Sequence, residues 1–343
     1  MQMRIMMVED MATEDKVTSD HLDLEAQRRE FWLRPYVWLP CVFLCIILWG
    51  SAFPAVKTGY NLFAIDSTSH TAVPSLLLFA GSRFSLAGLL TLIVTSILDR
   101  EVRLPKQINW RDIAILSVFQ TILQYGLFFI SLSNTTGATG SILASTSSFM
   151  AIILAGWFFP ADRFGLTKVW GCILGFGGVV VLNLMGGPQN WGFSLMGEGF
   201  MLISALSTAF GNVISKKMTE RNHPRLLSGW QFVLGGCILM LIGGVTGGRL
   251  QATTPWAWIL LLYLAALSST AFSLWTTMLK YHSVSKLSIF KSLIPIVGTV
   301  GSGIFLREDV LQWRYILALI LVISGIIVIN IKPTTIKQSV SDQ

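Results

Sequence analysis

Ten apolar runs, each about long enough to cross a lipid bilayer, constrain this chain more than any motif it contains. A membrane-spanning helix needs about 20 consecutive apolar residues. Only 13% of the residues are charged, against about 25% in a typical soluble domain. The sequence therefore predicts an all-α integral membrane protein with ten transmembrane helices. The runs cover residues 36–60, 75–98, 112–132, 138–159, 167–185, 197–217, 227–248, 256–279, 286–306 and 313–331.

Lysine and arginine are divided unequally between the segments that connect these runs. With the N-terminus inside the cell, seventeen lie in inner segments, and only Arg249, Arg307 and Arg314 lie in outer ones. Cytoplasmic loops of membrane proteins carry an excess of Lys and Arg. We therefore predict a protein of the cytoplasmic membrane with cytoplasmic tails at residues 1–35 and 332–343. The net charge of +7 does not indicate a nucleic-acid partner, because the charges form short clusters between apolar runs.

Two runs far apart in the sequence match each other. The second contains RFSLAGLLTLIV from Arg83, and the seventh contains QFVLGGCILMLI from Gln231, with Phe, Leu and Gly at equal offsets. This match divides the chain into halves at 36–187 and 195–331. Because each half has five runs, the second half starts from the opposite side of the membrane. The sequence thus predicts two inverted five-helix repeats around a central cavity, as in secondary transporters with a ligand site near the midplane.

Four short motifs resemble the EamA-type branch of the drug/metabolite transporter superfamily. They are LWGSAF in the first run, AGSRFSLAG in the second, Asp162-Arg163 after the fourth and IPIVGTVGSGIFLRED in the ninth. The resemblance covers residues 40–331 and implies a ten-helix carrier that moves a small metabolite by alternating access, often as an amino-acid exporter. The segment HSVSKLSIFK departs from the family pattern, since Lys286 and Lys291 stand where small residues are expected. The resemblance therefore does not fix the substrate class.

Three charged residues lie inside runs, and all three are cations: Lys57, Arg83 and Lys291. A charge at the centre of a membrane helix costs about 2.5–3.5 kcal/mol on insertion scales. Each has a structural alternative: Lys57 is near enough to the end of its run to snorkel to the surface, Arg83 can pair with backbone carbonyls, and Lys291 can bond carbonyls freed by Pro295. No acid lies in the middle of any run. This pattern favours a substrate with a carboxylate or phosphate group, moved by facilitated diffusion or exchange.

Several uncharged side chains complete the predicted site. The amides of Gln124, Asn212 and Gln231 are costly to bury, and Trp49 and Trp275 lie deeper than the tryptophans at run ends, where this residue anchors a helix to the interface. The candidate substrate-binding residues are therefore Lys57, Arg83, Lys291, Gln124, Asn212, Gln231, Trp49 and Trp275. The four cysteines have no metal-ligand spacing, so we expect neither a metal nor a cofactor.

The sequence as a whole predicts a secondary transporter that exports a small amino-acid-like or otherwise anionic metabolite. Its expected partners are that substrate, the lipid bilayer and, since GCILG at 171–175 is a close-packing motif, a second copy in a homodimer if the motif does not pack within its own subunit. A nucleotide-sugar or organophosphate carrier and a multidrug exporter are the alternatives within the superfamily. A channel or structural membrane subunit is the alternative outside it. An enzyme is not expected, because no catalytic motif such as G-x-S-x-G or H-E-x-x-H is present.

Overall fold

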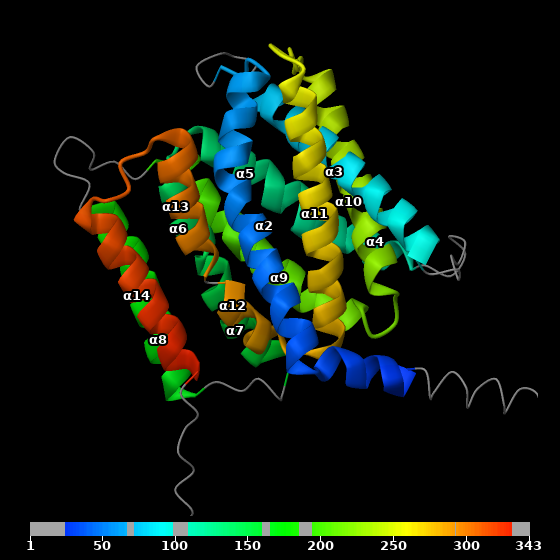
Figure 1. Cartoon of the computed structure of the whole chain (residues 1–343), viewed down its shortest axis with the longest axis vertical. Coiled ribbons are helices and arrows are strands. Elements are labelled where there is room, and N and C mark those ends of the chain that lie inside the picture. The colour runs from blue at the N-terminus through cyan, green and yellow to red at the C-terminus, as the bar shows by residue number, and fades with distance from the viewer. Residues whose placement is uncertain are drawn as a thin grey trace, which may run out of the picture.

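The structure is a computed structural model that describes residues 25–66, 72–98, 109–159, 165–184, 194–291 and 293–330. Within these ranges all regular secondary structure is helical, which confirms the predicted all-α class (Figure 1). Of the two predicted tails, only a helix over residues 25–33 and the start of α2 are described. The Asp162-Arg163 motif lies outside the described residues.

Each predicted run coincides with helical backbone, although several runs are divided into shorter helices. The third run consists of two α-helices joined by a π-helical turn, and the fourth and ninth runs are each interrupted once. The elements are α2 (Pro35–Leu62), α3 (Ala72–Leu98), α4 (Trp110–Ser117), η2 (Val118–Leu123), α5 (Gln124–Ser133), α6 (Gly137–Ala144), α7 (Thr146–Phe158), α8 (Leu166–Leu184), η4 (Leu195–Gly199), α9 (Phe200–Met218), α10 (Pro224–Val245), α11 (Trp256–Tyr281), α12 (Val284–Lys291), α13 (Ile294–Leu306) and α14 (Trp313–Asn330).

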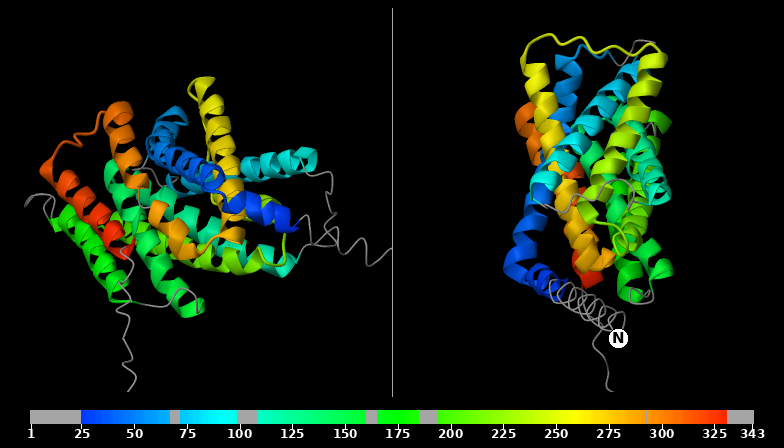
Figure 2. Two further views of the ribbon diagram at one scale, coloured as in Figure 1. Left: turned by 60° about the horizontal axis from the view of Figure 1, so that its bottom comes forward. Right: turned by 90° about the vertical axis from the view of Figure 1, so that its right-hand side faces the viewer.

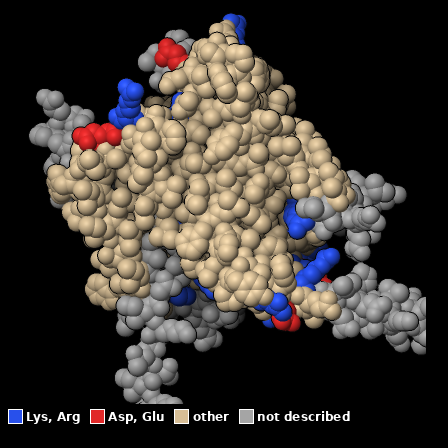
Figure 3. All heavy atoms as spheres, viewed as in Figure 1, with Lys and Arg blue, Asp and Glu red and all other residues tan. Residues whose placement is uncertain are grey.

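Six helical segments in the described part of the chain are long and apolar enough to cross a membrane. They are Pro35–Leu62, Ala72–Ile97, Trp110–Ser133, Gly137–Phe158, Pro224–Val245 and Trp256–Tyr281. Ile294–Leu306 and Trp313–Gly325 are shorter apolar helices. On the face shown in Figure 3, a broad belt without charged side chains crosses the middle of the molecule. The chain is therefore a multi-pass membrane protein, and the number of ten spans stays a prediction.

Glycines bring α3 and α10, which contain the matching second and seventh runs, into close contact. A Cβ atom added at Gly88 would lie 2.6 Å from the backbone nitrogen of Val233, and one at Gly236 would lie 2.6 Å from Oγ of Ser85. Membrane helices gain little from hydrophobic burial against each other, so small residues that permit close packing stabilise their contacts. The similar glycine patterns of these runs thus have a packing role.

A second close pair is α8 with α14, which lie side by side at one edge of the bundle in Figure 1 and in the left view of Figure 2. A Cβ atom added at Gly325 of α14 would lie 2.5 Å from the carbonyl oxygen of Gly171 and 2.9 Å from the backbone nitrogen of Gly175. The GCILG motif at 171–175 therefore packs against a helix of its own chain.

Two interrupted segments face each other within the bundle, α6–α7 and α12–α13. The first is interrupted at Ser145, and the second between Lys291 and Ile294, where Pro295 opens α13. Proline at the start of a helix is tolerated, but in the interior of a continuous helix it would remove a hydrogen bond and clash with the preceding turn. The interruptions leave α6 and α12 with 8 residues each and α7 and α13 with 13 each.

Candidate functional site

The two helix interruptions border a central cavity of about 90 Å³. A cavity of this size holds several water molecules, since one water needs roughly 10–15 Å³ on such a measure. Five aromatic rings and a few hydroxyl and amide groups form its walls together with two cations. The lining residues are Trp49, Ala52, Phe53, Arg83, Gln124, Tyr125, Phe128, Ala144, Ser145, Ser147, Thr208, Phe272, Lys291 and Ile294.

Lys291, the last residue of α12, holds its ammonium group between two indole rings. Nζ lies 4.5 Å from the ring centroid of Trp49 and 4.6 Å from that of Trp275. The two indoles are themselves in edge-to-face contact, with centroids 5.2 Å apart. The face of an aromatic ring attracts a cation, by about 2 kcal/mol or more when water is excluded. Only 6% of Lys291 is exposed, so this attraction acts on a nearly dry group.

Arg83 on α3 brings the second cation to the same cavity. Its Nε donates to the carbonyl oxygen of Leu264 at 3.3 Å and to Oγ of Ser268 at 3.1 Å, both on α11. Its Cζ atom lies 4.9 Å from the ring centroid of Phe84 and 6.0 Å from that of Tyr125. The bonds through Nε anchor the guanidinium to α11 and hold the side chain, which is buried, against the cavity.

The cavity combines these two cations with a lining in which no described residue is acidic. Burying a charge without a partner of opposite sign is unfavourable, because the group loses its hydration. A bound anion would supply that partner to both groups. The arrangement is therefore suited to a small solute with a carboxylate or phosphate group and an apolar body.

Two polar groups on the cavity wall have no hydrogen-bond partner in the described part of the chain. They are Oε1 of Gln124 and Nε1 of Trp49. Gln124 directly follows the π-helical turn η2, and such turns frequently occur at functional sites. The free carbonyl of Gln124 accepts a hydrogen bond and the indole of Trp49 donates one, so the two suit a ligand with both kinds of group.

Asn212 and Trp275 stand behind the cavity wall rather than on it. The indole Nε1 of Trp275 donates to Oδ1 of Asn212 at 3.2 Å, and Trp275 is 1% exposed. This bond holds the ring against the ammonium of Lys291. Asn212 thus acts on the cavity through Trp275.

Gln231 lies outside the cavity, in the contact between α10 and η2. Its Nε2 donates to Oε1 of Gln120 at 3.2 Å, and its Oε1 accepts from Oγ1 of Thr121 at 3.4 Å. These bonds offset the cost of burying the amide. The polarity that made Gln231 a candidate is therefore accounted for by helix packing.

Lys57 faces a different pocket, of about 300 Å³, that it shares with Glu308. Its Nζ donates to the carbonyl oxygen of Thr135 at 2.5 Å. The carboxylate of Glu308 accepts from the backbone N–H groups of Gly137 and Ala138 at 2.8 and 3.0 Å, at the start of α6, where these groups have no partner within the helix. Lys57 and Arg83 therefore do not face one cavity.

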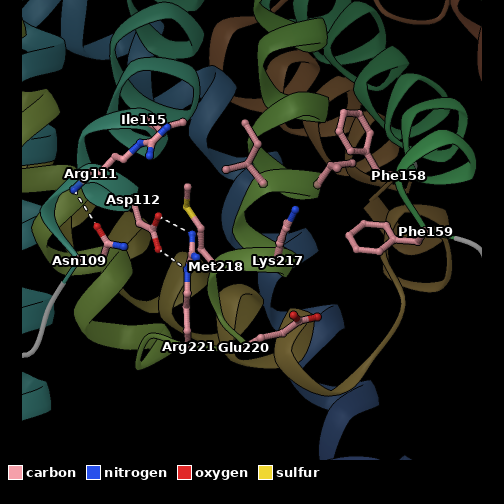
Figure 4. A pocket seen from close by; sticks show the side chains of 12 residues that line it. Asn109, Arg111, Asp112, Ile115, Phe158, Phe159, Lys217, Met218, Glu220 and Arg221 are labelled. Atoms are coloured by element: carbon pink, nitrogen blue, oxygen red, sulfur yellow. Dashed lines mark hydrogen bonds and ion pairs between the residues drawn. The ribbon is translucent and has the colours of Figure 1, made fainter.

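A larger pocket of about 430 Å³ lies between the ends of α4, α7 and α9 (Figure 4). Its central feature is Asp112, whose carboxylate accepts two bonds from Arg221, at 2.7 and 2.8 Å, and one from Nδ2 of Asn222 at 2.9 Å. These contacts connect α4 to the turn after α9. The lining of this pocket also carries Arg111, Lys217 and Glu220, so charges of both signs lie around it, in contrast to the central cavity.

Sequence reasoning missed several cavity residues, including the hydroxyl groups of Ser145, Ser147 and Thr208 and the rings of Phe53, Phe128 and Phe272. The run STSS at 145–148 is a usable signal, because consecutive small polar residues within an apolar run weaken a membrane helix. The phenylalanines have no such signal, since lipid-facing and cavity-facing rings are alike in sequence.

Apolar helices around a small cavity with buried charges define a class, the multi-pass membrane proteins that handle small polar solutes. The chain belongs to the EamA-like transporter family, whose model matches residues 36–184 and, a second time, residues 195–331. It is therefore a membrane transporter and not an enzyme, and its environment is a lipid bilayer.

Comparison with known proteins agrees with this assignment. The chain is 29% identical over 292 residues to the uncharacterized transporter YvbV of Bacillus subtilis (strain 168), a match that covers 84% of this chain and 89% of YvbV. It is 26% identical over 215 residues to a chloroplastic WAT1-related protein of Arabidopsis thaliana, over 60% of this chain and 51% of that protein. A solved crystal structure superposes with a TM-score of 0.64 at 20% identity, over 87% of this chain and 97% of that one, and so shares its fold.

Proposed function

We propose that this transporter is a secondary carrier that moves a small organic anion, amino-acid-like or otherwise, through the cavity that Arg83 and Lys291 share. The observation that carries the proposal is the presence of two buried basic side chains in one aromatic cavity whose described lining has no acid. A cationic substrate would be repelled there, whereas an anion pairs with both groups. Charged groups inside a membrane protein most often belong to such a substrate pathway.

The proposed carrier consists of ten spans in two inverted repeats, and the packing of the helices supports this arrangement. In such a repeat α7 corresponds to α13, and α9 corresponds to α2. The contact of α7 with α9 in one half of the pattern should therefore recur as a contact of α13 with α2. The contact of α5 with α9 likewise becomes that of α11 with α2, and all four contacts are present. The pairs α3–α10 and α8–α14 join counterparts directly, and the contact of α6 with α13 becomes that of α12 with α7, which is also present. The equal lengths of the interrupted helices fit the same symmetry.

Alternating access would proceed by rocking one half against the other around the cavity. Both halves contribute to its wall, the first with Trp49, Arg83 and Gln124 and the second with Phe272 and Lys291. Interrupted helices at the interface of two repeats are typical of substrate sites in secondary transporters. Such a motion would expose Arg83 and Lys291 to either side in turn.

We place the protein in the cytoplasmic membrane with both termini inside. Among the described residues, Arg34, Lys216 and Lys280 lie at the end of the bundle that carries the α9–α10 and α11–α12 connections, at the bottom of Figure 1, whereas Arg249 and Arg307 lie at the opposite end. This distribution follows the positive-inside rule. Net export and a homodimer remain part of the proposal, although the GCILG motif gives the dimer no support, since it packs within its own chain.

The test is a thermal-stability screen of the purified wild type and of Arg83→Gln against L-phenylalanine, phenylpyruvate, inorganic phosphate, uridine diphosphate glucose and tetraphenylphosphonium. A ligand that binds only the native state raises the unfolding midpoint by mass action. We expect a carboxylate to stabilise the wild type and to lose this effect in Arg83→Gln.

The other outcomes separate the alternatives. Stabilisation by phosphate or the nucleotide sugar alone would favour an organophosphate carrier. Stabilisation by tetraphenylphosphonium alone, equal in both proteins, would contradict the anion site and favour a multidrug exporter. Saturable uptake of the bound compound into proteoliposomes would distinguish a carrier from a channel, and the direction of the faster exchange would test export.

A further inference from the structure

We propose that Lys291 is a proton-binding site of the carrier, which gains a proton when the anion enters the central cavity and releases it when the anion leaves. This inference rests on the proposed function, because it concerns the same cavity and the same substrate. It adds a second transported species, the proton.

Among the described residues, the helices packed around Lys291 hold no acidic group that would keep an ammonium charged in the absence of a ligand. α12 packs against α2, α7, α9, α11 and α14, and none of these five helices has an acidic residue in its sequence. α7 has no titratable side chain at all. The titratable groups of α2 are Tyr36, Cys41, Cys45, Lys57 and Tyr60, and the thiol of Cys45 donates to the carbonyl oxygen of Ala271.

The remaining charged and titratable groups around Lys291 are cations or phenols. α9, α11 and α14 contain only Lys, Arg and Tyr among such residues, namely Lys216, Lys217, Tyr263, Lys280, Tyr281, Arg314 and Tyr315. On the cavity wall the groups are Arg83 and Tyr125. A second positive charge in the same small cavity disfavours the ammonium form, as does the loss of hydration in a side chain that is 6% exposed.

The faces of two indole rings, at 4.5 and 4.6 Å, act against these effects. This attraction stabilises the ammonium form of Lys291 but does not neutralise its positive charge. A carboxylate in the cavity would neutralise it, and so would shift the equilibrium from the amine to the ammonium. By thermodynamic linkage, protonation then raises the affinity for the anion by the same factor.

Arg83 cannot play this part, because a guanidinium does not lose its proton in proteins. A lysine amine does so readily when it is buried. The cavity therefore contains one permanent positive charge, which attracts the anion, and one conditional charge, which appears with it. The presence of a lysine at the end of α12 rather than a second arginine is what gives the site this property.

The proton balance is simple. The neutral amine takes one proton from water on the side to which the cavity is open, and no bond other than N–H is formed or broken. The proton returns to water on the other side when the anion dissociates. A monocarboxylate and one proton carry no net charge together, so their movement would not respond directly to membrane potential.

The first experiment measures the protonation state of Lys291 in the ligand-free protein. In protein labelled with ¹³C-lysine, the Cε resonance that disappears in Lys291→Arg belongs to Lys291, and the one that disappears in Lys57→Arg serves as the matched control. We expect the Lys291 resonance to have the chemical shift of a neutral amine at about pH 8, where an exposed lysine is an ammonium. The chemical shift of an ammonium at that pH would overturn the inference, whatever the ligand proves to be.

The second experiment counts protons during binding. Phenylpyruvate, whose carboxyl group stays ionised, is titrated calorimetrically into the wild type at about pH 8 in two buffers of different ionisation enthalpy. We expect uptake of about one proton per bound anion in the wild type and none in Lys291→Arg. Binding without proton uptake would overturn the inference and leave the anion carrier intact. If Arg83→Gln and the wild type bind only tetraphenylphosphonium, the proposed function itself is wrong, and the inference with it.

Discussion

Two lysines in the same helical bundle have opposite surroundings. Lys57 is half-buried, bonds the carbonyl oxygen of Thr135 and shares its pocket with the carboxylate of Glu308. Lys291 is almost fully buried, touches two indole rings and packs among helices without a single acid. In sequence both are lone cations in apolar runs. The comparison teaches that the first is satisfied by its own chain, whereas the second lacks an anion that only a ligand would bring.

This difference predicts a reversal between stability and function, which is the largest effect we expect. Lys291→Met should weaken anion binding roughly 100-fold, because a hydrogen bond to a charged group is worth about 1.5–3 kcal/mol, and should not lower the unfolding midpoint. Lys57→Met should lower the midpoint and change binding less than about threefold, since its contacts are within the chain. Binding isotherms and thermal scans of both variants measure this. Equal losses of binding would break the comparison.

The indole rings around Lys291 give a second test of the comparison. Trp49→Leu should weaken anion binding by about tenfold, because it removes one face of a dry cation–π contact worth roughly 2 kcal/mol and the free Nε1 donor. The matched control is Trp256→Leu, since Trp256 is 68% exposed at the start of α11. If both substitutions weaken binding equally, the effect comes from bilayer anchoring and not from the cavity.

Glu308, which shares a pocket with Lys57, gives a third test of the comparison. Glu308→Gln should destabilise the protein by about 1 kcal/mol, because a charged acceptor at a helix start is replaced by a neutral one, with little effect on anion binding. The neighbouring Asp309→Asn is the control, as Asp309 is exposed and accepts only from Nε2 of Gln312 in the bonds described. A thermal scan compares the two variants. A larger effect of Asp309→Asn would show that Glu308 does not stabilise α6.

The smallest predicted effect concerns His282, which lies just beyond α11 and outside the central cavity. Its substitution shows how much of any pH dependence of stability comes from this group and not from the cavity. Burial lowers the pKa of His282, and the nearby cations Lys286 and Lys216 add to this effect against a bond to the carbonyl oxygen of Trp32. Because the folded pKa lies below the unfolded value of about 6.5, stability is complete above that pH and falls as the pH drops through the folded pKa.

His282→Gln should remove this loss of stability, because glutamine does not titrate. The measurement is the unfolding midpoint of the wild type and of the variant at about pH 8 and pH 5. If the variant keeps the full acid sensitivity, the destabilising group lies elsewhere.

Much of the fold could be predicted because helix length and apolarity are local properties. Each of the ten runs falls on helical backbone, and the similar glycine patterns of the second and seventh runs correspond to the close contact of α3 with α10. The interruptions were less accessible. Pro295 marks the one before α13, but Ser145 and the π-helical turn η2 have no comparably strong signal, because their backbone geometry depends on the helices packed around them.

The site was predicted in part. Of the eight candidates, Trp49, Arg83, Gln124 and Lys291 line one cavity, and Trp275 and Asn212 support it from behind. Gln231 and Lys57 belong to other contacts. Gln231 has the same side chain as Gln124 and lies as far from the end of its run as Trp275 does from the end of its own, four residues, so no rule applied to single positions would have separated them.

The sequence by itself determined that this chain is an all-α membrane protein with three cations inside its apolar runs, because hydrophobicity and charge are properties of each residue in turn. Its motifs also carried the resemblance to a transporter family that the comparisons confirmed. Only the tertiary structure decided which of the cations have partners. Whether Lys57 meets a carbonyl and Lys291 meets indole rings depends on Thr135, Trp49 and Trp275, which lie 78, 242 and 16 positions away in the sequence. The electrostatic state of a buried charge is set by those neighbours and not by the charge itself.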